Sequence, residues 1–343
     1  MAENQPDAEG RDLKIWALLG AHRGDNNQVL ALAEALGLPF EIKQFRYNEL
    51  RRLQPKLLGA SLLSVSRDSR ALALDAAPDL TISAGQRSAP VVQFIRRRSD
   101  GRTRSVHIGF PRLSPDRFDL VVATPEYPIP DHPNVMRIPL AVSRPRQRVE
   151  ADGQMDRLAE PFKQPRNLLV LGGPSLYWNL EPRDVAEALS DLLDRAAGEG
   201  GSVYVIGSPR TPLPVLRAVE RQLATAKCPA MLVPMHGPPA YSQLLQAADR
   251  IFVTADSMVM GSEAVTSGKP VGLVPIRPTF GGRLYMGLMD RIGPKRRTYP
   301  RDLRFFWKVL DDLHLVGTVQ EPARGDVPDV SAEVAARVLR LIA

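Results

Sequence analysis

Strand and helix patterns alternate along almost the whole of this 343-residue chain. Apolar runs such as LKIWALLG (13–20) and DLTISAG (79–85) predict buried strands that end at glycine, whereas NNQVLALAEALGL has the spacing of a helix that stops at Gly37. Strands that alternate with helices predict a mainly parallel sheet covered by helices. Because the alternation restarts with NLLVLGG (167–173), we expect two doubly wound α/β domains.

Charge and periodicity indicate the domain boundaries. Residues 1–12 are polar and predict a flexible tail, and the charged segment 143–165 has no strong periodicity, so we expect a linker there. The N-terminal domain would then span 13–142 and the C-terminal domain 166–320, followed by a segment, 321–343, that ends in an amphipathic helix.

The composition of the chain indicates in which cellular compartment it works and which classes of partner it could bind. The chain has one cysteine, Cys228, and neither a signal-peptide pattern nor an apolar run long enough to span a bilayer, so we expect a cytoplasmic protein. Its formal net charge is +7, with arginine-rich clusters at 95–104, 143–148 and 293–304. Such clusters suit a phosphorylated ligand, a protein partner or a peripheral anionic membrane surface, although solvated faces explain them equally. Stacking aromatics do not alternate with these cations, so nucleic acid is not expected.

Two strand ends in the first half carry side chains suited to chemistry. In GAHRGDNNQ, after the first strand, His22 is an acid–base candidate, Arg23 a cation and Asp25 a carboxylate beside a helix N-terminus. The alternative is an ordinary helix with Asp25 as its N-cap and Asn26 and Asn27 in its first turn.

The second of these strand ends is ISAGQRSAP (82–90), where a strand meets Gly85 and a helix begins. Arg87 would project from this turn, and Ser88 would cap the helix. Ordinary strand–helix turn chemistry explains the same residues.

Three strand ends in the second half suit a phosphate. In LGGPSLYW (171–178), Gly172 and Gly173 with Ser175 predict a backbone cradle, and a tight turn is the alternative. In VIGSPRTP (205–212), Ser208 and Arg210 follow a strand, where the arginine could neutralise a diphosphate. His236 follows the next strand.

The segment VTADSMVMGSEAVTSGKPVGLVP (253–275) places polar residues where a crossover helix would need only apolar ones. Asp256 or Ser257 would cap the helix, and small residues would let it pack close to the sheet. Glu263 needs a partner if buried, and a ribose diol could supply it; otherwise Glu263 is an exposed helix residue. Gly268 would end the helix.

Other chemistries find little support in the sequence. The histidines are scattered without paired spacing, so we expect no metal site. There is no G-x-G-x-x-G and no Walker A motif, so neither a dinucleotide cofactor nor a P-loop is expected.

The combined segments resemble the GT-B architecture of nucleotide-sugar glycosyltransferases, in which two Rossmann-like domains face each other across a cleft. More closely, they resemble the mitochondrial fission factor family first named in plants for elongated mitochondria. The matching segments are GDNNQVLALAEALG, ISAGQRSAP, LGGPS, TADSMVMGSEAVTSGKPV and, more loosely, GGRLYMGLMDRIGPKRR. One departure is that Glu126-Tyr127 stands where family members often carry a His-Asp pair.

This resemblance implies a metal-independent glycosyltransferase that takes a nucleotide-diphosphate sugar of UDP type as substrate and needs no cofactor. His22 or Asp25 would be the catalytic base, with Arg23, Asn27, Gly85 and Arg87 on the acceptor side. The donor would contact Gly172, Gly173, Ser175, Ser208, Arg210, His236, Asp256, Ser257, Glu263 and Arg283. A non-catalytic adaptor that recruits a partner at a membrane surface, and a nucleotide-sugar 2-epimerase, are the alternatives.

Overall fold

The computed structural model describes residues 13–144, 163–235, 241–292 and 301–343. The chain divides into two compact units, unit 1 with Met1–Pro145 and Asp329–Ala343, and unit 2 with Arg146–Pro328. The predicted segment 321–343 is therefore split, because its first residues belong to unit 2 and its helix to unit 1. The predicted linker falls largely outside the described residues.

Unit 1 contains a parallel sheet in the order β2-β1-β3-β4-β5-β6. Its strands are β1 (Ile15–Leu19), β2 (Glu41–Gln44), β3 (Leu80–Ala84), β4 (Arg104–Ile108), β5 (Leu120–Ala123) and β6 (Val135–Arg137). Of these, β1 and β3 lie within the segments 13–20 and 79–85 that the sequence predicts to be strands. The strands other than β2 and β6 are largely buried because helices cover both faces of the sheet.

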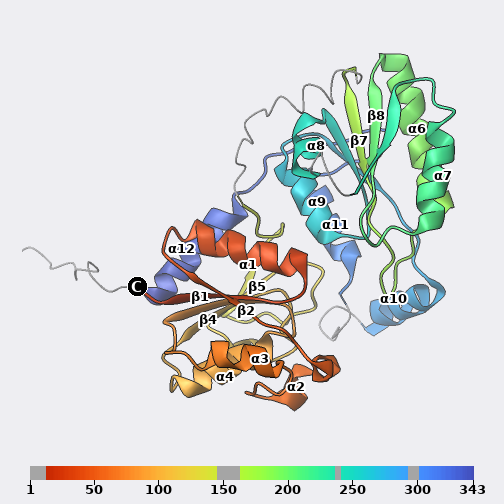
Figure 1. Cartoon of the computed structure of the whole chain (residues 1–343). Helices are drawn as coiled ribbons and strands as arrows, with labels where there is room; N and C mark the ends of the chain where they lie inside the picture. The colour runs from red at the N-terminus through yellow and green to blue at the C-terminus, as the bar shows by residue number, and fades with distance from the viewer. Residues whose placement is uncertain (1–12, 145–162, 236–240, 293–300) are drawn as a thin grey trace, which may run out of the picture. The chain divides into compact units, whose positions relative to one another are not determined.

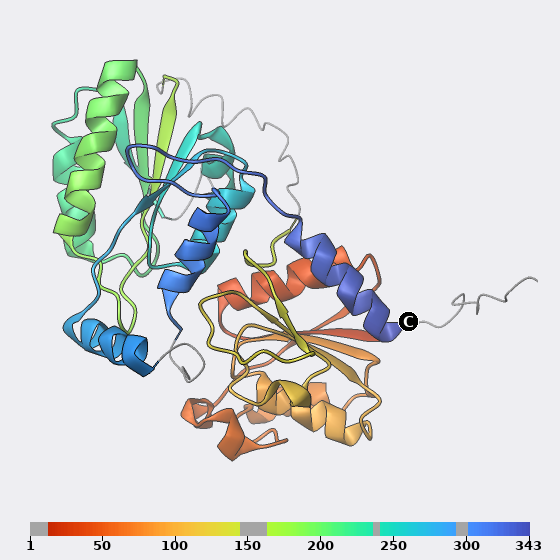
Figure 2. The same ribbon diagram turned by 180° about the vertical axis from the view of Figure 1, so that it is seen from behind.

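The helices of unit 1 form a layer on each side of this sheet (Figures 1 and 2). On one side lie α1 (Arg23–Ala35) and α12 (Val330–Ile342), and on the other lie α2 (Pro55–Leu58), α3 (Arg67–Arg70) and α4 (Ala89–Arg98). The chain after β2 forms a 3₁₀ turn, η1 (Glu49–Arg52), followed by the single turn of α2, because Pro55 can begin a helix but cannot donate a hydrogen bond to extend η1. Trp16, Phe45 and Phe118 are fully buried in the core.

Unit 2 contains a second parallel sheet, in the order β11-β10-β7-β8-β9. Its strands are β7 (Arg166–Val170), β8 (Ser202–Ile206), β9 (Ala230–Val233), β10 (Arg250–Thr254) and β11 (Val271–Val274). In chain order this arrangement is 3-2-1-4-5, the order of dinucleotide-binding folds.

Helices also cover both faces of the second sheet (Figure 1). On one side lie α6 (Pro182–Glu199) and α7 (Leu213–Leu223), and on the other lie α8 (Tyr241–Ala247), α9 (Met258–Thr266) and α11 (Leu303–Asp312). A further helix, α10 (Phe280–Ile292), follows β11. The chain then returns to the sheet, since Ala323 N–H donates to the Val271 carbonyl before α12 begins. None of the helices in the described part of the chain has both the length and the hydropathy to cross a bilayer.

His107 lies at the centre of unit 1 with no solvent exposure. It faces Ser83 on the neighbouring strand, and its Nδ1 is 2.9 Å from the Ser83 hydroxyl oxygen. Burial lowers the pKa of His107 to about 3, so the imidazole stays neutral in the folded protein.

This burial predicts that unit 1 loses stability as the pH falls. Below pH 6.5, the ordinary pKa of histidine, the unfolded chain binds a proton that the folded unit does not bind until about pH 3. The free energy of opening of the β3 and β4 amides, measured by hydrogen exchange, should fall by up to about 1.4 kcal/mol per pH unit. His107→Leu should reduce this slope by that amount.

The control variant is His314→Asn, at an exposed position whose φ of 54° asparagine tolerates. It should keep the wild-type slope. Equal slopes in the wild type and in His107→Leu would show that His107 does not set the acid sensitivity of unit 1.

Candidate functional site

Unit 1 has a pocket where the connections from neighbouring strands leave on opposite faces of the sheet. The loop after β1 leads into α1, and the loop after β3 leads into α4 on the other face (Figure 1). Ligands of open α/β sheets bind at such points. The pocket has a volume of about 150 Å³, and the lining includes Gly20, His22, Asp25, Asn26, Tyr47, Gly85 and Arg87. The structure thus brings together two loops that the sequence analysis selected independently.

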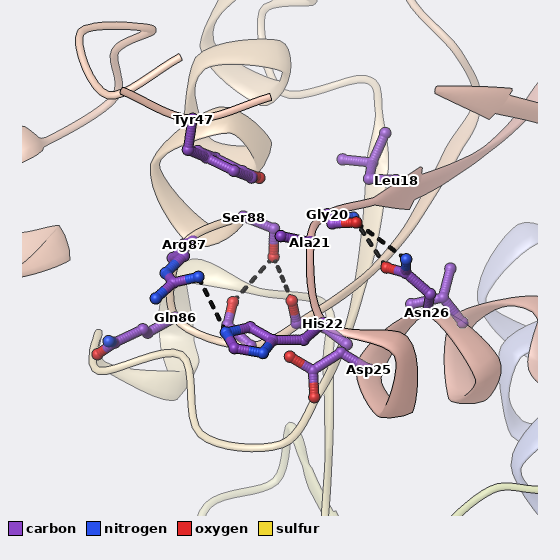
Figure 3. Close-up of a pocket in the computed structure, with 13 residues that line it drawn as sticks. Leu18, Gly20, Ala21, His22, Asp25, Asn26, Tyr47, Gln86, Arg87 and Ser88 are labelled. Carbon is purple, nitrogen blue, oxygen red and sulfur yellow. Dashed lines mark hydrogen bonds between the residues drawn. The ribbon is translucent and has the colours of Figure 1, made fainter. Parts of the chain in front are cut away.

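His22 and Arg87 meet across this pocket (Figure 3). Nη1 of Arg87 lies 2.9 Å from Nε2 of His22. A guanidinium can only donate, so Nε2 accepts and the proton of the neutral ring is on Nδ1. The nitrogen that would take a proton from a substrate is therefore engaged by Arg87.

Asp25 lies against the backbone of Gly85. A Cβ atom at residue 85 would be 2.7 Å from the Asp25 Oδ2 atom, and Gly85 also has a φ of +72°, so both space and backbone conformation require glycine. Asp25 is not the helix cap, because α1 begins at Arg23 with His22 at the N-cap position.

Asn26, which we considered only as a first-turn helix residue, closes the β1 loop. Its Oδ1 accepts from the Gly20 N–H at 2.8 Å, and its Nδ2 donates to the Gly20 carbonyl at 2.9 Å (Figure 3). The candidates Arg23 and Asn27 are exposed on α1 and are not part of the pocket lining.

Ser88 occupies the N-cap position of α4, as predicted, but its side chain does not cap the helix. The Ser88 hydroxyl donates back to the carbonyls of Ala84 and Gly85, both at 2.9 Å, and makes no cap hydrogen bond to α4 (Figure 3). This pair of bonds instead fixes the turn from which Arg87 projects.

Tyr47 forms the wall above this turn and was not predicted from the sequence (Figure 3). Burial raises its pKa well above the usual range, and the nearby Arg87 charge opposes this shift only in part. The phenol is therefore protonated and can act as a donor to a ligand in the pocket. The sequence carries no pattern around Tyr47 that distinguishes it from a core residue.

Unit 2 has the equivalent strand ends at β7 and β10, whose following helices α6 and α9 cover opposite faces of the sheet (Figure 1). The Gly172 N–H donates to Thr254 Oγ1 at 2.8 Å, and the Gly173 N–H donates to Asp256 Oδ2 at 2.8 Å. Both N–H groups are thus engaged within the protein, in place of the phosphate contacts that the sequence analysis predicted.

Both glycines are required for close packing. A Cβ at residue 172 would lie 1.9 Å from Asp256 Oδ2, and one at residue 173 would lie 2.3 Å from the Arg210 carbonyl oxygen. The tandem glycine therefore brings the β7 loop against both the β10 loop and the β8 loop.

Asp256 is fully buried, and its carboxylate is held by several donors. Thr254 donates to Oδ1 at 2.6 Å, and Arg210 Nη2 lies 3.4 Å from Oδ2. Burial raises the pKa of Asp256, while the bonds from Thr254 and Gly173 and the Arg210 charge oppose that shift. The half-exposed Arg210 thus lies between the buried carboxylate and solvent.

The β8 loop is tied to the glycines through hydroxyl groups. Ser208 Oγ donates to the Gly172 carbonyl at 3.0 Å, and Thr211 Oγ1 donates to the Leu171 carbonyl at 3.1 Å. Thr211 and Thr254 were not among the predicted site residues. Thr254 ends β10 and Thr211 lies in the loop after β8, and only the tertiary structure shows that they position the glycine loop.

Ser257 caps α9, as predicted, and its hydroxyl accepts from the Met260 N–H at 3.4 Å. Gly268 follows the helix with a φ of +65°, also as predicted. Gly261 does not serve packing on the sheet: a Cβ there would meet the ring of Trp307 on α11 at 2.4 Å.

Glu263 is half-buried on α9, beside the buried hydroxyl of Tyr241 on α8. Burial, followed by the charge of Glu263 and a hydrogen bond to it, raises the pKa of Tyr241 well above its ordinary value. The alternative of a fully exposed Glu263 is therefore wrong, and its carboxylate already has a neighbour within the protein.

The remaining described donor candidates, Ser175 and Arg283, lie on two segments that pair with each other. The Thr279 N–H donates to the Tyr177 carbonyl, and the rings of Tyr177 and Tyr285 stack 4.7 Å apart with an interplanar angle of 2°. Ser175 N–H donates to the Trp178 carbonyl, and Arg283 Nη1 donates to the Pro278 carbonyl at 3.4 Å. His236 lies outside the described residues.

The family departure at Glu126-Tyr127 lies at the end of β5. Glu126 is buried and its Oε1 accepts from the Thr124 hydroxyl at 2.9 Å. Tyr127 packs against Gly109, where a Cβ would be 3.6 Å from its ring. Both residues have structural roles at this strand end.

The close approach at Gly172 predicts a loss of stability on adding one methyl group. Gly172→Ala should lower the free energy of unfolding of unit 2 by about 1–3 kcal/mol, because the Cβ would overlap the buried Asp256 carboxylate. Gly198→Ala, in α6, is the matched control, since its Cβ would meet nothing within 4 Å. It should be neutral or stabilising by about 0.5–1 kcal/mol in urea unfolding. Equal effects of the two variants would contradict this packing.

Comparison with known proteins relates the fold to enzymes that act on nucleotide sugars. The UDP-GlcNAc 2-epimerase of Neisseria meningitidis, solved with UDP-GlcNAc bound, matches with a TM-score of 0.52 over 96% of this chain and 99% of that one. The identity is 10%, so the likeness concerns the fold, which is GT-B-like with two doubly wound α/β domains.

Two relatives are similar in sequence. An uncharacterised protein of Rickettsia prowazekii, RP120, is 22% identical over 299 residues, which are 76% of this chain and 82% of the relative. The mitochondrial fission protein ELM1 of Arabidopsis thaliana is 28% identical over 225 residues, or 57% of this chain and 51% of the plant protein. The family model described as mitochondrial fission ELM1 matches residues 23–287, most of the chain. The chain therefore belongs to the mitochondrial fission ELM1 family.

Proposed function

We propose that unit 2 binds a nucleotide-diphosphate sugar of UDP type at the ends of β7 and β10, and that the protein is a metal-independent glycosyltransferase. The observation that carries the proposal is the position of Arg210 and the capped N-terminus of α9 at one strand-order reversal, where the Gly172-Gly173 loop packs against the β8 and β10 loops. The Neisseria epimerase, which shares the fold, is bound to UDP-GlcNAc in its solved structure.

The diphosphate would be held by the N-terminus of α9 together with Arg210. Met258 and Val259 begin this nine-residue helix, so their N–H groups have no intrahelical carbonyl to bind. A helix N-terminus carries a partial positive charge, and a guanidinium can donate two parallel hydrogen bonds to a phosphate. In the proposed complex these groups stabilise the charge of the departing nucleotide without a metal ion.

In this structure the Arg210 guanidinium contacts Asp256, and in the proposed complex it would contact the diphosphate instead. The 3.4 Å contact from Arg210 Nη2 to Asp256 Oδ2 is long, and the arginine side chain is 48% exposed. An arriving diphosphate can therefore draw the guanidinium outward. The Gly173 N–H, the Thr254 hydroxyl and Arg210 all donate to the Asp256 carboxylate, which limits the repulsion between this group and a phosphate.

Glu263 remains our candidate for the ribose hydroxyls. It lies about one and a half helical turns beyond the α9 N-terminus, so one helix would contact both the phosphate and the sugar of the nucleotide. Tyr241 shares the Glu263 carboxylate, and a ribose diol would have to bind beside or replace that phenol.

The acceptor would bind in the unit 1 pocket. Because Arg87 engages Nε2 of His22, we propose Asp25 as the base that takes the proton of the acceptor hydroxyl, with His22 as its neighbour. Gly85 makes room for the Asp25 carboxylate, and Arg87 is positioned to contact an anionic acceptor.

Calorimetry with UDP tests the binding half of this proposal. Arg210→Gln should weaken UDP binding roughly 10- to 100-fold, because a hydrogen bond to a charged group contributes about 1.5–3 kcal/mol. Arg217→Gln removes an exposed arginine from α7 and should leave the affinity unchanged. Failure of every nucleoside diphosphate to bind at millimolar concentration would overturn the proposal.

Product analysis tests the catalytic half. With a UDP-sugar turned over by the wild type, Asp25→Asn should lower kcat at least about 100-fold while UDP affinity stays the same, as expected for loss of a general base. Conversion of a single UDP-sugar to its epimer without an acceptor would instead identify an epimerase. Binding without any turnover would support the adaptor role.

A further inference from the structure

Unit 1 carries an exposed apolar surface that the proposed sugar chemistry does not use. It lies on residues 46–70, between β2 and β3, which we call the leucine lobe. Four leucines of this lobe are at least 43% exposed: Leu50, Leu53, Leu57 and Leu63. Single exposed apolar residues are common on protein surfaces, but four within fourteen residues form a patch that indicates an interaction site.

The two ends of the lobe are joined, so the leucines belong to one compact element. Asn48 N–H donates to the Ser64 carbonyl at 2.9 Å, and the Asn48 amide donates to the Leu63 carbonyl at 2.7 Å. Ser66 N–H donates to the Arg46 carbonyl, which closes the loop at its base. The buried Leu58 and Val65 anchor the lobe to unit 1, while the four exposed leucines point away from the core.

The lobe is strongly cationic. It contains six cationic residues, against the two acidic residues Glu49 and Asp68, which gives a net charge of +4. Glu49 pairs with Arg51 at 3.6 Å and with Arg52 at 3.0 Å. Arg46, Arg52, Lys56 and Arg67 are exposed.

The neighbouring helix extends this charge. Helices α2 and α3 lie with α4 on the same face of the sheet (Figures 1 and 2). The C-terminal turn of α4 carries Arg96, Arg97 and Arg98, and Arg97 is exposed. The exposed Arg97 at the end of α4 and the leucine lobe therefore lie on the same face of the sheet of unit 1.

We propose that the leucine lobe docks unit 1 on an anionic membrane surface, with its leucines inserted at the lipid interface and its cations among the lipid headgroups. Apolar side chains and cations together supply the two signals that stable peripheral binding needs. The charge complementarity decides against a second copy of this chain as the partner, since two lobes of net charge +4 would repel each other. The inference is independent of the proposed sugar chemistry.

Vesicle flotation of the full chain tests this assignment. Wild-type protein should float with phosphatidylcholine vesicles that contain about 30 mol% phosphatidylglycerol, should bind pure phosphatidylcholine far more weakly, and should dissociate as salt screens the charges. Leu53→Glu/Leu57→Glu should weaken vesicle binding at least about tenfold, because the two substitutions would place negatively charged carboxylates at the lipid interface. UDP calorimetry of the same variant should match the wild type, which separates this result from failure of the proposed function.

The matched control is Leu213→Glu/Leu313→Glu, which changes two exposed leucines of unit 2 that lie 100 residues apart in the chain, one at the start of α7 and one after α11. It should float like the wild type. Absence of wild-type flotation, equal losses in both double variants, or unchanged flotation of the lobe variant would each overturn the assignment. Loss of self-association in the lobe variant, with vesicle binding unchanged, would instead identify the lobe as a dimer contact and overturn the proposal.

Discussion

The buried carboxylate of Asp256 holds the strand ends of unit 2 together. It accepts from the Gly173 N–H at 2.8 Å and from the Thr254 hydroxyl at 2.6 Å, so the β7 loop and the β10 loop have a common anchor. The glycine at 172 is needed because any side chain there would overlap this carboxylate. The position of α9, whose N-cap Ser257 directly follows Asp256, depends on the same anchor.

The two units share one packing arrangement at their strand ends, in which a carboxylate lies against a glycine. Each places a glycine-containing loop beside the loop of the adjacent strand where the strand order reverses. In unit 1 the carboxylate of Asp25 lies against Gly85, and in unit 2 that of Asp256 lies against Gly172. Asp25 lines a pocket, whereas Asp256 is fully buried and contacts the half-exposed Arg210. This difference is why we assign chemistry to Asp25 and loop positioning to Asp256.

Much of the fold could be predicted from the sequence because local patterns set it. The strands and the helix ends at Gly37 and Gly268 follow from apolar runs and from glycine's tolerance of positive φ. The site was predicted less completely. The direction of the Gly172 and Gly173 N–H groups depends on Thr254 and Asp256, about 80 residues away in the chain.

Other features of the site depend on tertiary contacts in the same way. The pairing of His22 with Arg87 joins residues 65 positions apart, and the return of α12 to unit 1 follows a segment that packs on unit 2. Neither contact produces a recognisable pattern in the local sequence. Asn26 rather than Asn27 lines the pocket because the Asn26 side chain is hydrogen-bonded to the β1 loop at Gly20. The exposure of the leucines in residues 46–70 likewise depends on the tertiary structure, since the sequence alone does not distinguish them from core residues.

The central claim is that the ends of β7 and β10 form a nucleotide-diphosphate site. A crystal structure of the protein soaked with UDP tests it most directly. We expect diphosphate density at the N-terminus of α9, with the Arg210 guanidinium moved from Asp256 to a phosphate oxygen. Density for UDP in the unit 1 pocket, or a diphosphate that contacts neither α9 nor Arg210, would contradict it.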